Sequence, residues 1–182
     1  MRFWPRKTWK KAVLVVLIAL VAVAAFFEWS VYREVSASTE TLNAGGSKSA
    51  LVIYHPGLTS FAHDIAENFS RGLASSGWQV DIATASQQAP TNISKYQLLV
   101  LCWPIYDFNP APTITSQIHR LGDLQGTKTI VVAVAGGLDP LNAVGNMDNI
   151  VHSANGTVID TLRAFRGSHN LDLQEKASQI IP

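Results

Sequence analysis

Residues 50–69 read ALVIYHPGLTSFAHDIAENF, which joins an apolar run, a short turn and an amphipathic stretch. The run at 50–54 is continuously apolar, as expected for a strand buried on both faces of a parallel sheet. Phe61, Ile65 and Phe69 then recur every four residues, which is typical of a helix with one apolar stripe. The sequence therefore predicts a strand, a tight turn and a helix in direct succession.

The same alternation continues to the end of the chain. Strands that alternate with helices imply a parallel sheet covered on both faces, with right-handed crossovers. We therefore predict an α/β three-layer sandwich with five parallel strands. The further strands are expected at 78–82, 97–102, 129–134 and 157–165, and the further helices at 114–121, 140–151 and 171–181.

Composition excludes several classes of protein. The chain has 182 residues, of which 47% are hydrophobic and 15% charged, which is too apolar for a disordered protein. A single cysteine, Cys102, forms no intramolecular disulfide and supplies no cysteine-rich metal site. Five of the 14 basic residues precede residue 12, which leaves nine against 13 acidic residues beyond it. A mildly acidic domain lacks the basic surface that nucleic acid requires.

The amino terminus has the pattern of a membrane anchor. Residues 12–27 are all apolar, and Trp9 and Trp29 flank them as the interfacial aromatics of a span do. We therefore predict a transmembrane anchor at 12–32. The basic segment 1–11 is expected to stay in the cytoplasm, which places the carboxyl-terminal domain on the extracytoplasmic side of the cell membrane in a single-pass arrangement.

Two other interpretations of this apolar segment stay open. It is also compatible with a cleaved signal peptide, although the small-residue site at 35–37 lies ten residues downstream and beyond a charged stretch. A helix buried in a protein core is the third interpretation. Residues 33–49 are rich in Ser, Thr and Gly and lack periodicity, which predicts a flexible linker before a domain at 50–182.

Ligands of such sheets bind outside the carboxyl ends of the strands, where the loops 55–60, 103–112 and 135–140 are expected to meet. The first loop leads into the amino end of a helix, whose unpaired amides and dipole hold an anion without Lys or Arg. Alternatively, Thr59 or Ser60 only caps the helix.

The second loop carries three aromatic residues, Trp103, Tyr106 and Phe108. Aromatic rings on an exposed rim can stack on a planar ligand, and Asp107 beside them would disfavour a negative charge on it. Alternatively, Trp103 and Tyr106 pack down onto the sheet. Two glycines after the fourth predicted strand permit a close approach of the backbone to a ligand, or simply end the strand.

These features resemble the flavodoxin-like family over residues 50–181. In that family a loop of the form S/T-x-T-G-x-T after the first strand binds the phosphate of FMN, and the loops after the third and fourth strands flank the flavin ring. Thr59 matches the second hydroxyl residue of that loop, and Pro104 and Tyr106 match the third-strand loop. Gly57 stands where the family has its first hydroxyl residue.

The resemblance implies the strand order 2-1-3-4-5 and an FMN cofactor. It implies no catalytic residue, and the five histidines of the chain are dispersed without metal-ligand spacing, so no metal site is expected. The residues expected to bind FMN are His55, Pro56, Gly57, Leu58, Thr59, Ser60, Phe61, Trp103, Pro104, Ile105, Tyr106, Asp107, Phe108, Gly136, Gly137 and Asp139.

Three functions follow from this interpretation. The first is a membrane-anchored electron-transfer protein that binds FMN and meets a redox partner protein. The second is a binding or scaffold module of the same fold that has lost FMN, because loop hydroxyls are missing and Trp103 is bulky. The third is a flavin enzyme that acts on quinone, with the anchor at 12–32 holding it near a lipid-soluble substrate.

Overall fold

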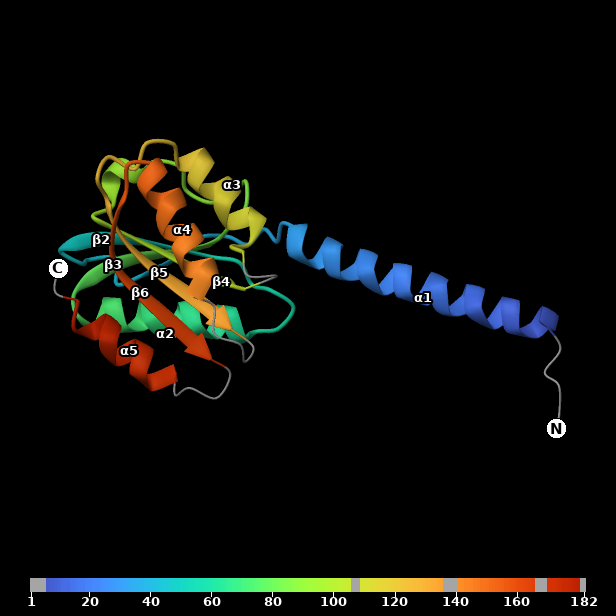
Figure 1. Cartoon of the computed structure of the whole chain (residues 1–182). Coiled ribbons are helices and arrows are strands. Elements are labelled where there is room, and N and C mark those ends of the chain that lie inside the picture. The colour runs from blue at the N-terminus through green and yellow to red at the C-terminus, as the bar shows by residue number, and fades with distance from the viewer. Residues whose placement is uncertain (1–5, 106–108, 136–140, 166–169, 181–182) are drawn as a thin grey trace. The chain divides into compact units, whose positions relative to one another are not determined.

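The computed structural model describes the chain except for residues 1–5, 106–108, 136–140, 166–169 and 181–182 (Figure 1). The chain forms two units, Met1–Arg33 and Glu34–Pro182.

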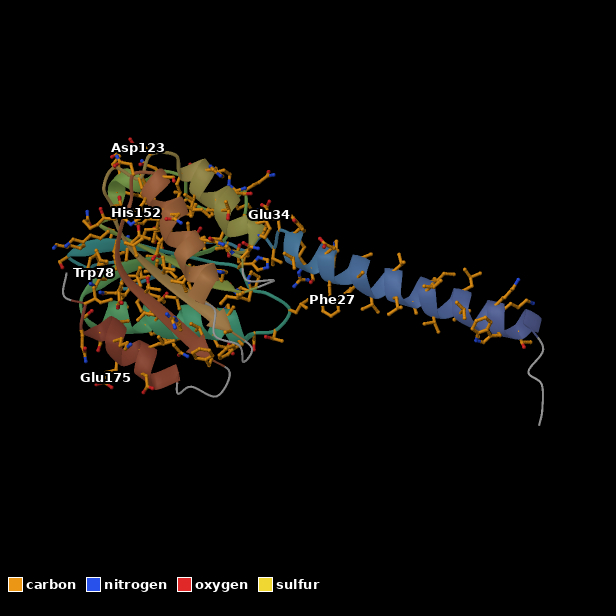
Figure 2. The ribbon with its side chains drawn as sticks, in the orientation of Figure 1. Phe27, Glu34, Trp78, Asp123, His152 and Glu175 are labelled. Carbon is orange, nitrogen blue, oxygen red and sulfur yellow. The ribbon has the colours of Figure 1, made fainter. Side chains whose placement is uncertain are left out.

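The first unit is a single long helix, α1 (Arg6–Tyr32). Its segment Thr8–Tyr32 is long and apolar enough to cross a membrane, and such a segment near the amino terminus also fits a signal sequence. Its apolar side chains, Phe27 among them, project outward from the ribbon (Figure 2). The orientation of the chain across a membrane remains a prediction.

The second unit is built on one six-stranded sheet of order β1-β3-β2-β4-β5-β6. Five of its strands run parallel, and β1 at one edge runs antiparallel to β3. The strands are β1 (Glu40–Leu42), β2 (Lys48–Tyr54), β3 (Trp78–Thr84), β4 (Leu98–Pro104), β5 (Lys128–Ala135) and β6 (Thr157–Phe165), with a short 3-10 helix, η1 (Ile93–Lys95), before β4.

The predicted parallel order 2-1-3-4-5 is confirmed as β3-β2-β4-β5-β6, but the sheet has six strands rather than five. The additional strand β1 comes from the segment expected to be a flexible linker. Thr41 Oγ1 donates a 2.7 Å hydrogen bond to Asp81 Oδ1 on β3, and the Ala37 amide donates to Thr84 Oγ1 at 3.1 Å. These cross-strand bonds hold the segment to the sheet, and the folded unit begins at Glu34 rather than at residue 50.

Helices cover both faces of the sheet, as the three-layer prediction required (Figure 1). One face carries α2 (Phe61–Ser75) and α5 (Asn170–Ser178), and the other carries α3 (Pro112–Leu121) and α4 (Leu141–Ser153). Alternate side chains of the buried strands enter two separate cores, one on each face. Helices α2 and α5 approach closely because Gly72 has no side chain: a Cβ there would lie 2.7 Å from the Ala177 Cβ atom.

The parallel register brings the carboxyl ends of the central strands to one edge. Tyr54 at the end of β2 lies opposite Cys102 on β4, and Pro104 at the end of β4 lies opposite Val134 on β5. The loops that follow β2, β4 and β5, which the sequence predicted to meet, therefore begin next to one another at this edge.

Candidate functional site

A cavity of about 200 Å³ lies where these strands end and α2 begins. It draws residues from the β2–α2 loop, from the first turn of α2 and from the ends of β4 and β5. Its lining residues are Pro56, Gly57, Leu58, Thr59, Phe61, Ala62, Pro104, Ile105, Val134 and Ala135.

The amino end of α2 is open toward a ligand. Gly57 has φ +69°, a left-handed conformation that glycine adopts at little cost, and this turn leads the chain into the helix. Ser60 is the N-cap, but its side chain caps no amide. Among the described residues, no group accepts a hydrogen bond from the amides of Ala62 and His63. These two donors and the positive end of the helix dipole therefore suit an anion.

The hydroxyl groups of this loop make local contacts. Thr59 Oγ1 accepts a long hydrogen bond of 3.4 Å from the Phe61 amide. Ser60 Oγ donates to Asp64 Oδ2 at 3.0 Å, and His63 Nδ1 lies 3.4 Å from the other Asp64 oxygen. A carboxylate in the first turn stabilises the helix and repels an incoming anion. The site thus combines amides that favour the binding of an anion with the Asp64 carboxylate, which disfavours it.

The structure brings together most of the described residues that the sequence singled out. Seven of them line the cavity, from the β2–α2 loop, the start of α2 and the end of β4, and Ser60 lies exposed beside them. The predictions for Tyr106, Asp107, Phe108, Gly136, Gly137 and Asp139 concern residues outside the described part of the chain.

Two predicted residues point away from the cavity. Trp103 is completely buried in the core beneath α3 and α4, which agrees with the alternative that it packs down onto the sheet. His55 is buried on the same side, with its Nδ1 atom 3.0 Å from Thr113 Oγ1 at the start of α3. Neither of these two side chains fills the cavity.

Three lining residues were not among those predicted to bind FMN: Ala62, Val134 and Ala135, although the predicted rim loop 135–140 begins at Ala135. Val134 and Ala135 are the last residues of β5. The position of these two small side chains directly before Gly136 is the sequence signal that could have identified them. Ala62 is fixed by Cys102, whose Sγ atom lies 3.7 Å from the Ala62 carbonyl oxygen. Burial raises the pKa of Cys102, so this thiol stays neutral and acts as a packing group.

The two ends of the cavity differ in chemistry. The amides of α2 form a polar end that suits a phosphate group. Pro104, Ile105, Val134 and Ala135 form an apolar wall that suits an uncharged planar ring. The described residues therefore offer an anion-binding end and an apolar wall, in a cavity whose described part, at about 200 Å³, is smaller than most small-molecule sites.

No protein-family model matches the sequence, and no curated protein is similar to it in sequence. Solved structures are similar in fold. A flavodiiron core from Synechocystis sp. has a TM-score of 0.61 at 15% identity, and the match covers 75% of this chain and 36% of that one.

Smaller proteins match over nearly their whole length. A flavodoxin from Megasphaera elsdenii has a TM-score of 0.57 at 15% identity and covers 71% of this chain and 98% of its own. A flavoprotein from Lactobacillus acidophilus, solved in complex with FMN, has a TM-score of 0.52 at 12% identity, with coverages of 64% and 93%. The chain thus has a flavodoxin-like fold and spans about a third of the flavodiiron core.

Proposed function

We propose that this flavodoxin-like domain binds FMN and serves as a membrane-tethered electron-transfer protein. The observation that carries the proposal is the pair of amides in the first turn of α2, from Ala62 and His63, that have no acceptor in the described structure; Ala62 lines the cavity at the carboxyl edge of the sheet, and His63 follows it in the helix. The structural similarity to flavodoxins and to an FMN-containing flavoprotein supports it.

Different residues of the cavity would bind different parts of FMN. The amides of Ala62 and His63 would hold the phosphate, and the Thr59 hydroxyl would add a donor once it turns from the Phe61 amide. Pro104, Ile105, Val134 and Ala135 would lie against the flavin ring and exclude water from it. FMN, when bound, supplies the one-electron and two-electron chemistry.

The helix α1 would tether the domain to the membrane and so concentrate it near its partner. We propose a redox partner protein at the membrane surface, reached by a domain on the extracytoplasmic side. A quinone as direct substrate is a variant of this proposal, and turnover of a short-chain quinone by the reduced protein would identify it.

The test is an FMN titration of the full-length protein in detergent micelles, followed by quenching of flavin fluorescence. We expect saturation at one FMN per chain. Thr59→Glu should abolish binding because it adds a carboxylate at the phosphate end. Thr157→Glu is the matched control, since Thr157 begins β6 at the opposite end of the strands, and it should bind normally. Equal binding by both variants would refute the assigned site.

One observation favours the second candidate, a binding module without flavin. The Asp64 carboxylate occupies the first turn of α2, and no Lys or Arg lies between Lys48 and Arg71 to offset it. If the native protein leaves FMN fluorescence unchanged while the domain is folded by circular dichroism, this candidate replaces the first.

A further inference from the structure

A second cavity, of about 400 Å³, lies on the α2 side of the sheet, next to β1. It shares no lining residue with the cavity assigned to FMN. Its lining residues are Ala37, Ser38, Thr39, Glu40, Tyr54, His63, Glu67, Ile82 and Thr84.

The additional strand creates this cavity. Glu40 of β1 pairs with Ile82 of β3, and the Ala37 amide is held by Thr84 Oγ1, so residues 37–40 form a wall along the edge of the sheet. On the opposite side, α2 supplies His63 and Glu67, which face the same way because they are four residues apart.

The cavity is acidic. Two carboxylates, those of Glu40 and Glu67, line it, and the other titratable groups among its described lining residues are the His63 imidazole and the Tyr54 phenol. Arg71 pairs with Glu67 but is not a lining residue. Burial and then the nearby Glu40 charge raise the pKa of Tyr54, and Cys102 and Glu67 raise it further. The Tyr54 phenol therefore stays uncharged beside carboxylate groups.

Tyr54 gives an independent indication of a ligand. Its side chain is only 8% exposed, and it lines the cavity. Among the described residues, none forms a hydrogen bond with its hydroxyl group. Its ring meets the His63 ring edge to face, with the centroids 5.4 Å apart. The Tyr54 hydroxyl therefore opens into the cavity, where a bound molecule can form a hydrogen bond with it.

We propose that this cavity binds a small organic ammonium ion. The carboxylates of Glu40 and Glu67 accept hydrogen bonds from its N–H groups, the phenol oxygen accepts another, and the ring of Tyr54 attracts the cation. Ile82 and Ala37 supply apolar surface for the carbon atoms of the ion. The volume lies within the range of small-molecule sites.

A metal ion fits this cavity less well. Among the described residues, no group of three or more His, Cys, Asp or Glu side chains is arranged to hold one. An organic cation needs fewer ligands, because aromatic and apolar surface provides part of the contact. The same ammonium chemistry occurs in free amines and in the head group of phosphatidylethanolamine.

The test is calorimetric titration of the full-length protein, in detergent, with n-butylamine hydrochloride, and with n-butanol as the uncharged analogue. We expect saturable binding of n-butylammonium only. Glu40→Gln should weaken it at least fivefold, and Tyr54→Phe, which removes only the hydroxyl, about threefold. Glu175→Gln is the matched control, because Glu175 is an exposed carboxylate on α5 that does not line the cavity, and it should bind as the native protein does (Figure 2).

Circular dichroism checks that each variant folds. If Glu40→Gln does not fold, the Tyr54→Phe variant still tests the site. Absence of n-butylammonium binding, equal binding of n-butanol, or unchanged affinity in the folded Tyr54→Phe variant would overturn the proposal. Repeating the titration in phosphatidylglycerol nanodiscs with and without phosphatidylethanolamine separates the sources. Weaker binding only with phosphatidylethanolamine identifies the lipid head group as the ligand, and equal binding identifies a free amine.

Discussion

Replacing Asp64 by Asn should strengthen FMN binding while weakening the helix that binds it. Asp64 lies in the first turn of α2, and its carboxylate accepts a hydrogen bond from Ser60 Oγ. An FMN phosphate at the amino end of the helix would carry a charge of about −2. The two groups repel each other, and the substitution removes the repulsion with almost no change in shape.

The geometry of the helix sets the size of this effect. Asp64 follows the N-cap residue Ser60 by four residues, which is about 6 Å along the helix axis, so a phosphate placed beyond the amino end of the helix would lie roughly 8 Å from the Asp64 carboxylate. The Asp64 side chain is 45% exposed, so a water-like dielectric applies. The repulsion is then about 1 kcal/mol, which corresponds to a roughly fivefold gain in affinity. Salt at physiological strength reduces it to about twofold, since the screening length is about 8 Å.

The assay is the fluorescence titration with FMN at low and at physiological salt, together with urea unfolding of the protein without FMN. Asp64→Asn should cost about 0.5 kcal/mol in the free energy of unfolding, because a favourable charge leaves the helix terminus. Asp172→Asn is the matched control in the first turn of α5: it should lose similar stability and leave FMN affinity unchanged. Unchanged or weaker FMN binding by Asp64→Asn would refute the placement of the phosphate at α2.

Three further predictions concern the fold. Gly72→Ala should lower the free energy of unfolding by about 2 kcal/mol, because the new Cβ atom would meet Ala177. Gly145→Ala in α4, which has open space around it, should raise the free energy of unfolding by about 1 kcal/mol. Urea midpoints of the two variants that move in the same direction would contradict this. Thr41→Val should cost about 1 kcal/mol by removing the bond to Asp81, and Thr39→Val, with no such bond, should be neutral in the same measurement. Burial raises the pKa of Cys102 from 9.0 and that of Tyr96 from 10.0, so both groups ionise more readily in the unfolded chain. The free energy of unfolding should therefore fall as the pH rises above 9. A urea midpoint that stays constant from pH 8 to 10.5 would contradict this prediction.

The sequence predicted the central strands well because they are buried on both faces. Continuous apolar runs such as 129–134 match β5, and the four-residue spacing of Phe61, Ile65 and Phe69 matches the buried stripe of α2. The parallel direction of the strands followed from the alternation of strands and helices, and their order followed from the resemblance to the flavodoxin-like family. These strands and helices can be predicted from the sequence because the residue types within each segment are enough to indicate its structure.

The elements that the sequence missed are fixed by partners elsewhere in the chain. Strand β1 is only three residues long, two of them polar, and it pairs where β3 offers an open edge and Asp81 an acceptor for Thr41. The burial of Trp103 was also open, since a large aromatic residue at the end of a strand packs wherever a helix leaves room, which here is beneath α3 and α4. The second cavity depends on β1 and could not be predicted without it.

The most direct test of the account is an amide NMR spectrum of the full-length protein in micelles during an FMN titration. Phosphate binding at the amino end of α2 predicts that the amide resonances of Ala62 and His63 shift downfield as the phosphate accepts their hydrogen bonds, and that the amide resonance of Glu175 on α5 does not move. Saturable FMN binding that leaves the Ala62 and His63 resonances unchanged would contradict it.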